Sequence, residues 1–312
     1  MNNAIYLDPP FSDDERRRRL YEGQLFVYSP RRSALALTTF AKGLIEEAFA
    51  PFDPRTAQHE MEVDRYAGIL NKLKPAFIHH PDSKRLVQEL LADLGCDPEK
   101  TYFDVPRMRS STSSGYLTTG IAYAWHPHRD TWYSAPHCQI NIWTPIYEIA
   151  SENAMAFHPR YFSQGVANDS AGYNYYQWNK MHRGDHIAGY TNTDPRPLPK
   201  ATEAIEMDPQ LRVVVPVGGV LIFSGAQMHS SVPNTSGVTR FSIDFRTVHL
   251  DDLIGHRGAP NVDSDCTGTT IRDYLRAKDF GRLPDDIVEL YDDGTATASG
   301  RGLIYQAAGT GD

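Results

Sequence analysis

The sequence predicts a mainly β protein with flanking α-helices, and two patterns along the chain support this prediction. From about residue 116 to 248, short runs rich in Ile, Val, Tyr and Thr are broken by Gly, Pro and Asn, which is typical of an antiparallel sandwich or barrel. In the first hundred or so residues, apolar side chains instead recur at helical spacing. We therefore expect a β core that is preceded by a helical segment.

The expected elements follow from these patterns in chain order. A short strand at 24–28 precedes three helices, at 33–50, 57–73 and 82–95. Six strands are then expected, at 116–125, 138–148, 154–158, 211–215, 219–224 and 238–248. A last helix is expected around 270–278.

The 312 residues are expected to form one domain, because β cores of about 200 to 250 residues often fold as single units. The helical support covers 1–115, the β core covers 116–250, and a C-terminal extension covers 251–312. An insert at 163–210 has little periodicity but many aromatic side chains, namely Tyr173, Tyr175, Tyr176, Trp178 and Tyr190. Long connections of this kind are usually functional, so we expect a lid, with a surface loop as the alternative.

The charge and the cysteine content limit which binding partners and which cellular compartment we expect for this protein. The net charge of −8 disfavours nucleic acid as a partner, and no stretch of about 18 apolar residues could span a bilayer. Three widely spaced cysteines, Cys96, Cys138 and Cys266, argue against a disulfide framework and fit a reducing cytoplasm. The N-terminus is not expected to be a secretory signal. The four arginines at 16–19 are expected to form a solvated helix face. No pattern indicates an oligomeric state.

Three residues could hold one metal ion. His128 and Asp130 are two positions apart, and on a strand this spacing puts both side chains on the same face. His229, just past an apolar strand, could supply the third ligand. Two histidines and one carboxylate make the facial triad of non-haem iron oxygenases, which leaves positions open for a chelating co-substrate and dioxygen.

Two further strands carry polar residues on one face. Arg240 and Ser242 share a face of the strand after His229, and a guanidinium fork beside a hydroxyl suits a carboxylate. On an earlier strand, polar side chains alternate with isoleucines, and the polar face holds Gln139, Asn141 and Trp143. Because buried amides without partners are costly, we expect this face to line a hydrated or ligand-filled cavity.

The chain resembles the phytanoyl-CoA dioxygenase family of Fe(II)/2-oxoglutarate-dependent oxygenases. The resemblance is carried by HRDTW (128–132), QINIWTPIYEI (139–149), SENAMAFHPRYF (151–162), GGVLIFSGAQMHSS (218–231) and RFSIDFRTV (240–248). It implies a double-stranded β-helix, a cupin-like jelly-roll core with N-terminal helices. It also implies that Fe(II) is bound by His128, Asp130 and His229. The residues implied for 2-oxoglutarate are Arg240, Ser242, Trp143, Gln139 and Asn141.

The implied activity uses O2 to hydroxylate an unactivated C–H bond of a small polar metabolite, while 2-oxoglutarate is converted to succinate and CO2. Desaturation, epimerisation and cyclisation are open alternatives for the same chemistry. A zinc-dependent or cupin-like hydrolase or isomerase could use the same three ligands, and a non-catalytic jelly-roll binding module is a further alternative. The candidate substrate-facing residues, whose charges suggest a carboxylate or phosphate, are Arg107, Arg109, His126, Arg129, Trp132, Tyr133, Arg160 and Arg246.

Overall fold

The structure is a computed structural model that describes residues 4–118, 126–182 and 197–292. Most strands form one mixed eight-stranded sheet, in which β1 pairs with β2 in parallel and the other pairs are antiparallel. The path through this sheet is β1 (Ile5–Leu7), β2 (Leu25–Tyr28), β8 (Val220–Ser224), β5 (Ile140–Pro145), β10 (Arg240–His249), β3 (Thr101–Phe103) and β11 (Leu275–Arg276), and β4 (Arg107–Ser111) also pairs with β10. A smaller sheet has the order β7 (Leu211–Val213), β6 (Met155–Phe157) and β9 (His229–Ser231).

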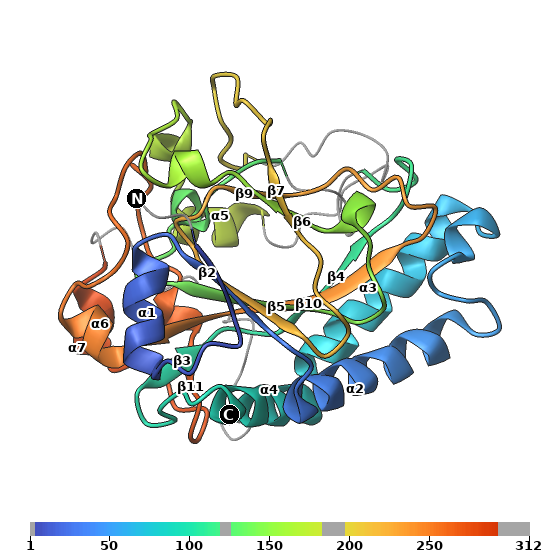
Figure 1. Cartoon of the computed structure of the whole chain (residues 1–312), viewed down its shortest axis with the longest axis horizontal. Coiled ribbons are helices and arrows are strands. Elements are labelled where there is room, and N and C mark those ends of the chain that lie inside the picture. The colour runs from blue at the N-terminus through green and yellow to red at the C-terminus, as the bar shows by residue number, and fades with distance from the viewer. Residues whose placement is uncertain (1–3, 119–125, 183–196, 293–312) are drawn as a thin grey trace.

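The large sheet lies between a helical layer and the small sheet (Figure 1). On the helical side, Ile142 of β5 and Phe245 of β10 belong to an apolar cluster shared with the helices. On the other side, Trp143 and Leu221 pack in a second cluster with Phe157 of the small sheet. Because neighbouring residues of a strand point to opposite faces, each central strand serves both layers. The helices of this layer are α2 (Arg32–Phe49), α3 (Val63–His79) and α4 (Pro81–Asp93).

The remaining helices are shorter and lie away from this layer. Helices α1, α6 and α7 gather at one end of the large sheet, and α5 lies near the small sheet (Figure 1). None of the helices within the described ranges is long and apolar enough to cross a membrane. Their bounds are α1 (Asp13–Tyr21), α5 (Tyr175–His182), α6 (Leu250–Ile254) and α7 (Asp285–Glu289).

The helical predictions are confirmed for the first part of the chain and wrong near its end. Helices α2 and α4 have nearly the expected bounds, whereas α3 begins later than expected because Ala57–His59 form a separate 3₁₀ turn. The helix expected around 270–278 is absent, since Ile271–Asp273 form a 3₁₀ turn and the next residues form β11.

The strand predictions agree with β2, β5, β6, β7, β8 and β10. Strands β1, β3, β4 and β9 are not foreseen, because each has only three to five residues and no clear alternation. In the expected strand 116–125, residues 116–118 form no strand and the others lie outside the described residues. Since β1 to β4 all join the large sheet, the part of the chain before residue 116 supplies strands as well as helices.

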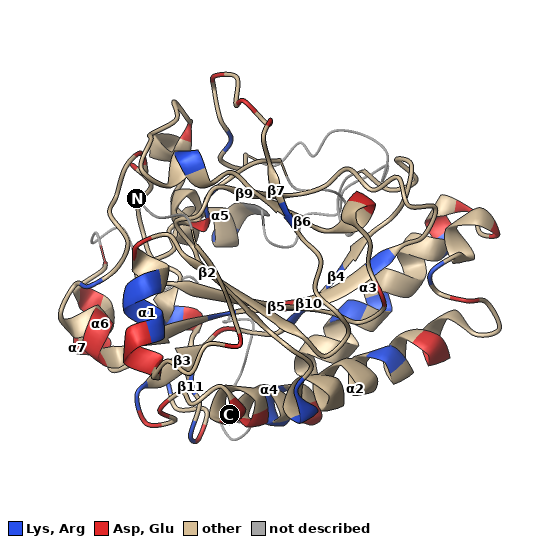
Figure 2. Ribbon diagram, viewed as in Figure 1, with Lys and Arg blue, Asp and Glu red and all other residues tan. Residues whose placement is uncertain are grey.

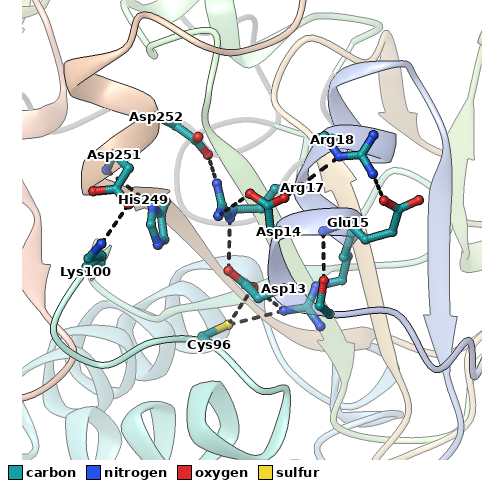
Figure 3. A network of polar contacts seen from close by, with 12 residues as sticks. Asp13, Asp14, Glu15, Arg17, Arg18, Cys96, Lys100, His249, Asp251 and Asp252 are labelled. Carbon is teal, nitrogen blue, oxygen red and sulfur yellow. Dashed lines mark hydrogen bonds and ion pairs between the residues drawn. The ribbon is translucent and has the colours of Figure 1, made fainter.

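Helix α1 carries charges of both signs (Figure 2), and the prediction of a solvated arginine face is only partly correct. Arg18 is exposed, but Arg16 and Arg17 are buried. Arg17 pairs with Asp13 at 2.9 Å, with Asp14 at 3.2 Å and, across the fold, with buried Asp252 of α6 (Figure 3). This network ties the N-terminal helix to the segment that follows β10.

We predict that Asp252→Ala destabilises the protein by about 3 kcal/mol or more, because it leaves the buried Arg17 guanidinium short of a partner. The matched control is Asp14→Ala, which removes another partner of Arg17. The Asp14 side chain is 70% exposed, against 2% for Asp252, so the control should cost at most about 1 kcal/mol. Urea unfolding measures both free energies, and equal losses would contradict the prediction.

The contribution of Asp252 should also depend on pH. Burial by itself would raise the pKa of this carboxyl, but hydrogen bonds from Arg17 and Tyr21 outweigh it and hold the pKa below the usual 3.8. Its stabilising effect is therefore complete above pH 3.8 and is lost as the pH falls through the lower folded-state pKa. The stability difference between wild type and Asp252→Ala should shrink over that acidic range.

Candidate active site

The structure brings together the three residues that the sequence predicts as metal ligands. One ligand atom each of His128, Asp130 and His229 lies within 4.8 Å of the other two, and all three residues are buried. The backbones of His128 and His229 form an antiparallel bridge with N–H···O distances of 3.0 Å in both directions. Asp130 begins a 3₁₀ turn, Asp130–Tyr133, rather than continuing a strand. Its N–H donates to the carbonyl of Gly225 at 2.8 Å, which fixes the turn beside the bridge.

Both histidines present the same ring nitrogen to the site. Nδ1 of His128 is 2.7 Å from the carbonyl of His126, and Nδ1 of His229 is 2.9 Å from the carbonyl of Gln227. A carbonyl only accepts, so Nδ1 carries the hydrogen and Nε2 keeps its lone pair. The two Nε2 atoms lie 3.5 and 3.9 Å from Oδ1 of Asp130. Burial lowers the pKa of His229 to about 4, which keeps this imidazole neutral at physiological pH and able to bind a metal.

The second oxygen of Asp130 is held by side-chain amides. Gln139 and Asn141 of the β5 region donate to Oδ2 at 2.8 and 2.7 Å, and Arg246 lies 3.7 Å from the same atom. The hydroxyl of Tyr274 donates to Oε1 of Gln139 at 2.8 Å, which turns the Gln139 NH2 group towards Asp130. Oδ1 is thereby left for the metal. Two imidazoles and one carboxylate form a donor set that fits Fe(II) with open positions for 2-oxoglutarate and O2.

A cavity of about 500 Å³ opens beside the three ligands and is large enough for small molecules. Arg240 lines it from β10 and is 6% exposed. Its guanidinium donates to the carbonyl of Asn153 at 2.9 Å and lies 5.8 Å from the centre of the Trp143 ring. Burial lowers the pKa of Arg240 to about 10, so the group is still charged. Within the described ranges, no carboxylate lies at ion-pair distance from it.

The serine that accompanies Arg240 differs from the predicted one. Ser231 of β9 accepts a hydrogen bond from Arg240 at 3.0 Å and lines the cavity. Ser242 is fully buried, and among the described residues its hydroxyl has no hydrogen-bond partner and it does not belong to the cavity lining. Gln139, Asn141 and Trp143 do line the cavity, although the two amides contact Asp130 directly.

The aromatic insert covers part of the cavity. Tyr173, Tyr175 and Trp178 line it, and Tyr173 packs edge-on against Tyr133 with ring centres 5.7 Å apart. The Tyr133 hydroxyl donates to the carbonyl of Pro199 at 2.7 Å. Tyr190 of the expected lid lies outside the described residues. The described part of the insert thus has the position that a lid requires.

Four of the candidate substrate-facing residues line the cavity, namely Arg107, Arg109, Tyr133 and Arg246. The other four do not. Arg129 is buried and pairs with Asp263 at 3.0 Å, and the indole N–H of Trp132 donates to the same carboxylate at 2.8 Å. Arg160 is exposed and pairs with Glu206, and the exposed His126 contributes its carbonyl to His128. The contacts of Arg129 and Trp132 with Asp263 and of His126 with His128 support the structure around the site, whereas Arg160 lies on the surface.

Other cavity residues carry no sequence signal that would have identified them. Asp104 and Asp244 hold the cavity arginines, Tyr274 orients Gln139, and Lys74 of α3 enters the lining from the helical layer. Only Asp244 could have been found, because it shares strand parity with Arg240 and Arg246. The others come from segments far away in the sequence.

We predict that Asn141→Ala and Tyr274→Phe weaken metal binding by about tenfold to a hundredfold, since groups that orient a ligand commonly have effects of this size. Calorimetric titration with Co(II), an air-stable substitute for Fe(II), measures the affinity. Asn179→Ala is the matched control, because Asn179 also lines the cavity but bonds to the carbonyl of Tyr175. Unchanged affinity in Asn141→Ala would refute the orienting role.

Comparison with known proteins places the chain beside non-haem oxygenases at low similarity. No family model matches the chain, and no curated protein matches its sequence. Similar solved structures include EvdO2 from Micromonospora carbonacea var. aurantiaca complexed with 2-oxoglutarate, at 11% identity over 77% of this chain and 91% of that chain with a TM-score of 0.45. SnoK, a non-heme alpha ketoglutarate dependent carbocyclase from nogalamycin biosynthesis, shows 14% identity over 82% and 93% with a TM-score of 0.42. At TM-scores below 0.5 we assign no residue role from this likeness, and membership of the phytanoyl-CoA dioxygenase family remains a prediction.

Proposed function

We propose that this protein is an Fe(II)/2-oxoglutarate-dependent dioxygenase of the phytanoyl-CoA dioxygenase type, with a jelly-roll core, that hydroxylates an unactivated C–H bond of a small polar metabolite. The observation that carries the proposal is the joint presence, in one cavity, of the His128, Asp130 and His229 triad and a buried arginine without a carboxylate partner among the described residues.

The buried guanidinium calls for an anionic ligand. A charge removed from water is costly unless a counter-charge compensates it, and carbonyl and hydroxyl oxygens are the only hydrogen-bond acceptors that the described residues give Arg240. A carboxylate in the cavity would supply the missing charge and take a bidentate hydrogen bond.

The distance between this arginine and the metal ligands suits a short diacid. Ser231, which binds Arg240, and His229 are two residues apart on β9, so their Cα atoms are separated by about 6 to 7 Å along one face. A five-carbon dicarboxylate such as 2-oxoglutarate can span this interval with one end at the metal and the other at Arg240. This match favours 2-oxoglutarate over a monocarboxylate.

The residues of the chain divide the work of the reaction. With iron bound, the site supplies the oxidation in which 2-oxoglutarate, O2 and the substrate C–H bond yield succinate, CO2 and an alcohol. The triad holds the metal, Arg240 and Ser231 orient the co-substrate, and the aromatic side chains of the insert limit the access of water. A zinc hydrolase would leave the charge of Arg240 without a use, and a non-catalytic binding module would be expected to have lost a metal ligand, whereas all three are present.

The proposal predicts a weak visible charge-transfer band when 2-oxoglutarate is added anaerobically to the protein with Fe(II). Asp130→Ala should abolish both metal binding and succinate release while the protein stays folded, because Arg246 keeps Asp104 and Asp244 as charge partners. Succinate release that survives this change would mean that the ligands are assigned wrongly.

A second prediction separates the two serines near Arg240. Arg240→Gln should weaken 2-oxoglutarate binding by about tenfold or more, since hydrogen bonds to charged groups contribute about 1.5 to 3 kcal/mol, with metal affinity unchanged. Ser231→Ala should weaken it less, and Ser242→Ala should have no effect because Ser242 lies outside the cavity. Titration of the charge-transfer band gives each affinity, and a larger effect at Ser242 than at Ser231 would restore the sequence-based assignment.

A further inference from the structure

The cavity contains a second group of arginines besides Arg240, which lie along β10 from the position opposite Ser242 to Arg246. Register pairs Asp244 of β10 with Arg107 of β4, and Ser242 with Arg109, so both arginines lie on the same face of the sheet as Arg240 and Arg246. Arg107, Arg109 and Arg246 all line the cavity. We call these three residues the outer arginine group.

The outer arginine group has fewer carboxylates than guanidiniums. Asp104 pairs with Arg107 and lies 3.3 Å from Arg246, and Asp244 pairs with Arg109 at 2.6 Å and lies 3.7 Å from Arg246. Two carboxylates are thus shared by three cations. Arg246 lies near both carboxylates and also 3.7 Å from Asp130. Because the proposed function assigns the charge of Asp130 to the metal, Asp104 and Asp244 are left for the three guanidiniums.

Two of the arginines keep hydrogen-bond donors for a ligand. A guanidinium has five N–H donors, of which Arg107 uses one and Arg109 two in hydrogen bonds to carboxylates of the described chain. Their side chains are 23% and 32% exposed, whereas that of Arg240 is buried. The outer arginine group is therefore accessible to a molecule in the cavity.

The charge of the whole cavity agrees with this reading. Among the described lining residues, five are Lys or Arg and four are Asp. A ferrous ion and a 2-oxoglutarate dianion would cancel each other. Burial lowers the pKa of Lys74 to about 7, so at neutral pH the lining keeps a net charge between zero and one positive charge. Beside the metal ligands the lining has an aromatic row, in which the Tyr133 ring lies 5.5 Å from the His128 ring and Tyr173 packs between Tyr133 and Trp178.

We propose that the primary substrate is an amphipathic organic anion, a carboxylate or a phosphate ester, whose acidic group is bound by Arg107 and Arg109 while its apolar body lies along the aromatic wall near the metal. This inference rests on the proposed function, because it assigns Arg240 to the co-substrate and leaves the outer arginine group for the substrate.

The test uses small probes on the anaerobic protein loaded with Fe(II) and 2-oxoglutarate. Calorimetry compares phenylbutyrate with its neutral amide, and phenylethyl phosphate with phenylethanol. At least one acid should bind about tenfold tighter than its neutral partner, as expected for charge-assisted hydrogen bonds. The acid whose affinity exceeds that of its neutral partner by the larger factor shows whether the acidic group of the substrate is a carboxylate or a phosphate.

Variants locate the effect on the outer arginine group. Arg107→Gln and Arg109→Gln should each remove most of the preference for the acid. Arg160→Gln, which changes an exposed arginine outside the cavity, should keep it. If loss of charge beside Asp244 prevents folding, Arg109→Lys preserves the ion pair and should still reduce the preference, because lysine lacks the planar fork.

The outcomes separate this inference from the proposed function. If the charge-transfer band forms but no acid is preferred, or if the preference survives in the arginine variants, the substrate assignment is overturned while the oxygenase assignment stands. If the band does not form in the wild type, the proposed function itself fails. The band should form normally in Arg107→Gln and Arg109→Gln, since neither residue belongs to the proposed co-substrate site.

Discussion

The site depends on one constraint, which is that the two oxygens of the Asp130 carboxylate have different partners. The charge of a buried carboxylate must be compensated by hydrogen bonds or by an opposite charge. Oδ2 of Asp130 has both, because it accepts two amide hydrogen bonds and lies near the Arg246 guanidinium. Oδ1 then faces the two histidine Nε2 atoms. Burial by itself would raise the pKa of Asp130, but the contact with His128 and the charge of Arg246 hold the pKa well below its usual value. The residue is therefore an anion, as a metal ligand must be.

This constraint explains why the inner face of the large sheet is polar. Along β10, Phe241, Ile243 and Phe245 belong to the apolar core beneath the sheet, while the alternate residues face the small sheet. Arginines and an aspartate cannot pack into a dry interior without partners, and their partners come from β4, β5 and β9. The cavity is thus a consequence of a strand whose two faces carry opposite chemistry.

The metal ligands could be predicted from sequence because their chemistry and spacing are local signals. His128 and Asp130 are two residues apart, so a single contact with the segment of His229 brings all three ligands together. The alternation of polar and apolar residues in β10 can likewise be seen in the sequence of that strand alone. The direction of Arg129 and Trp132 could not be predicted, because both lie next to ligands in the sequence but point to Asp263. The 3₁₀ turn at Asp130–Tyr133 breaks the strand parity on which the prediction relied.

The contribution of the C-terminal extension to the site, a hydrogen bond from Tyr274 to Gln139, could not be predicted from the sequence for a related reason. Tyr274 lies in a stretch expected to be helical, and its hydroxyl matters only through Gln139, which lies 135 positions earlier in the chain. A contact of this kind has no periodic pattern, since a single side chain from an irregular segment makes it. The same holds for Ser231, which replaces the expected Ser242 beside Arg240 because it belongs to the facing sheet.

The distribution of charge along β10 gives the two ends of this strand different tasks. Arg240 and Arg246 are six residues apart, which corresponds to about 20 Å of extended chain between their Cα atoms. At the first end, a single buried guanidinium bonds to neutral oxygens, which suits a fixed co-substrate that supplies the whole counter-charge. Further along the strand, Arg246 and the two arginines of β4 that lie opposite Ser242 and Asp244 share two carboxylates and are partly exposed, which suits a ligand that enters and leaves. Since Arg246 also lies near Asp130, the second end is coupled to the candidate metal centre through a direct charge contact, and an anion bound there would change the field at the metal ligand.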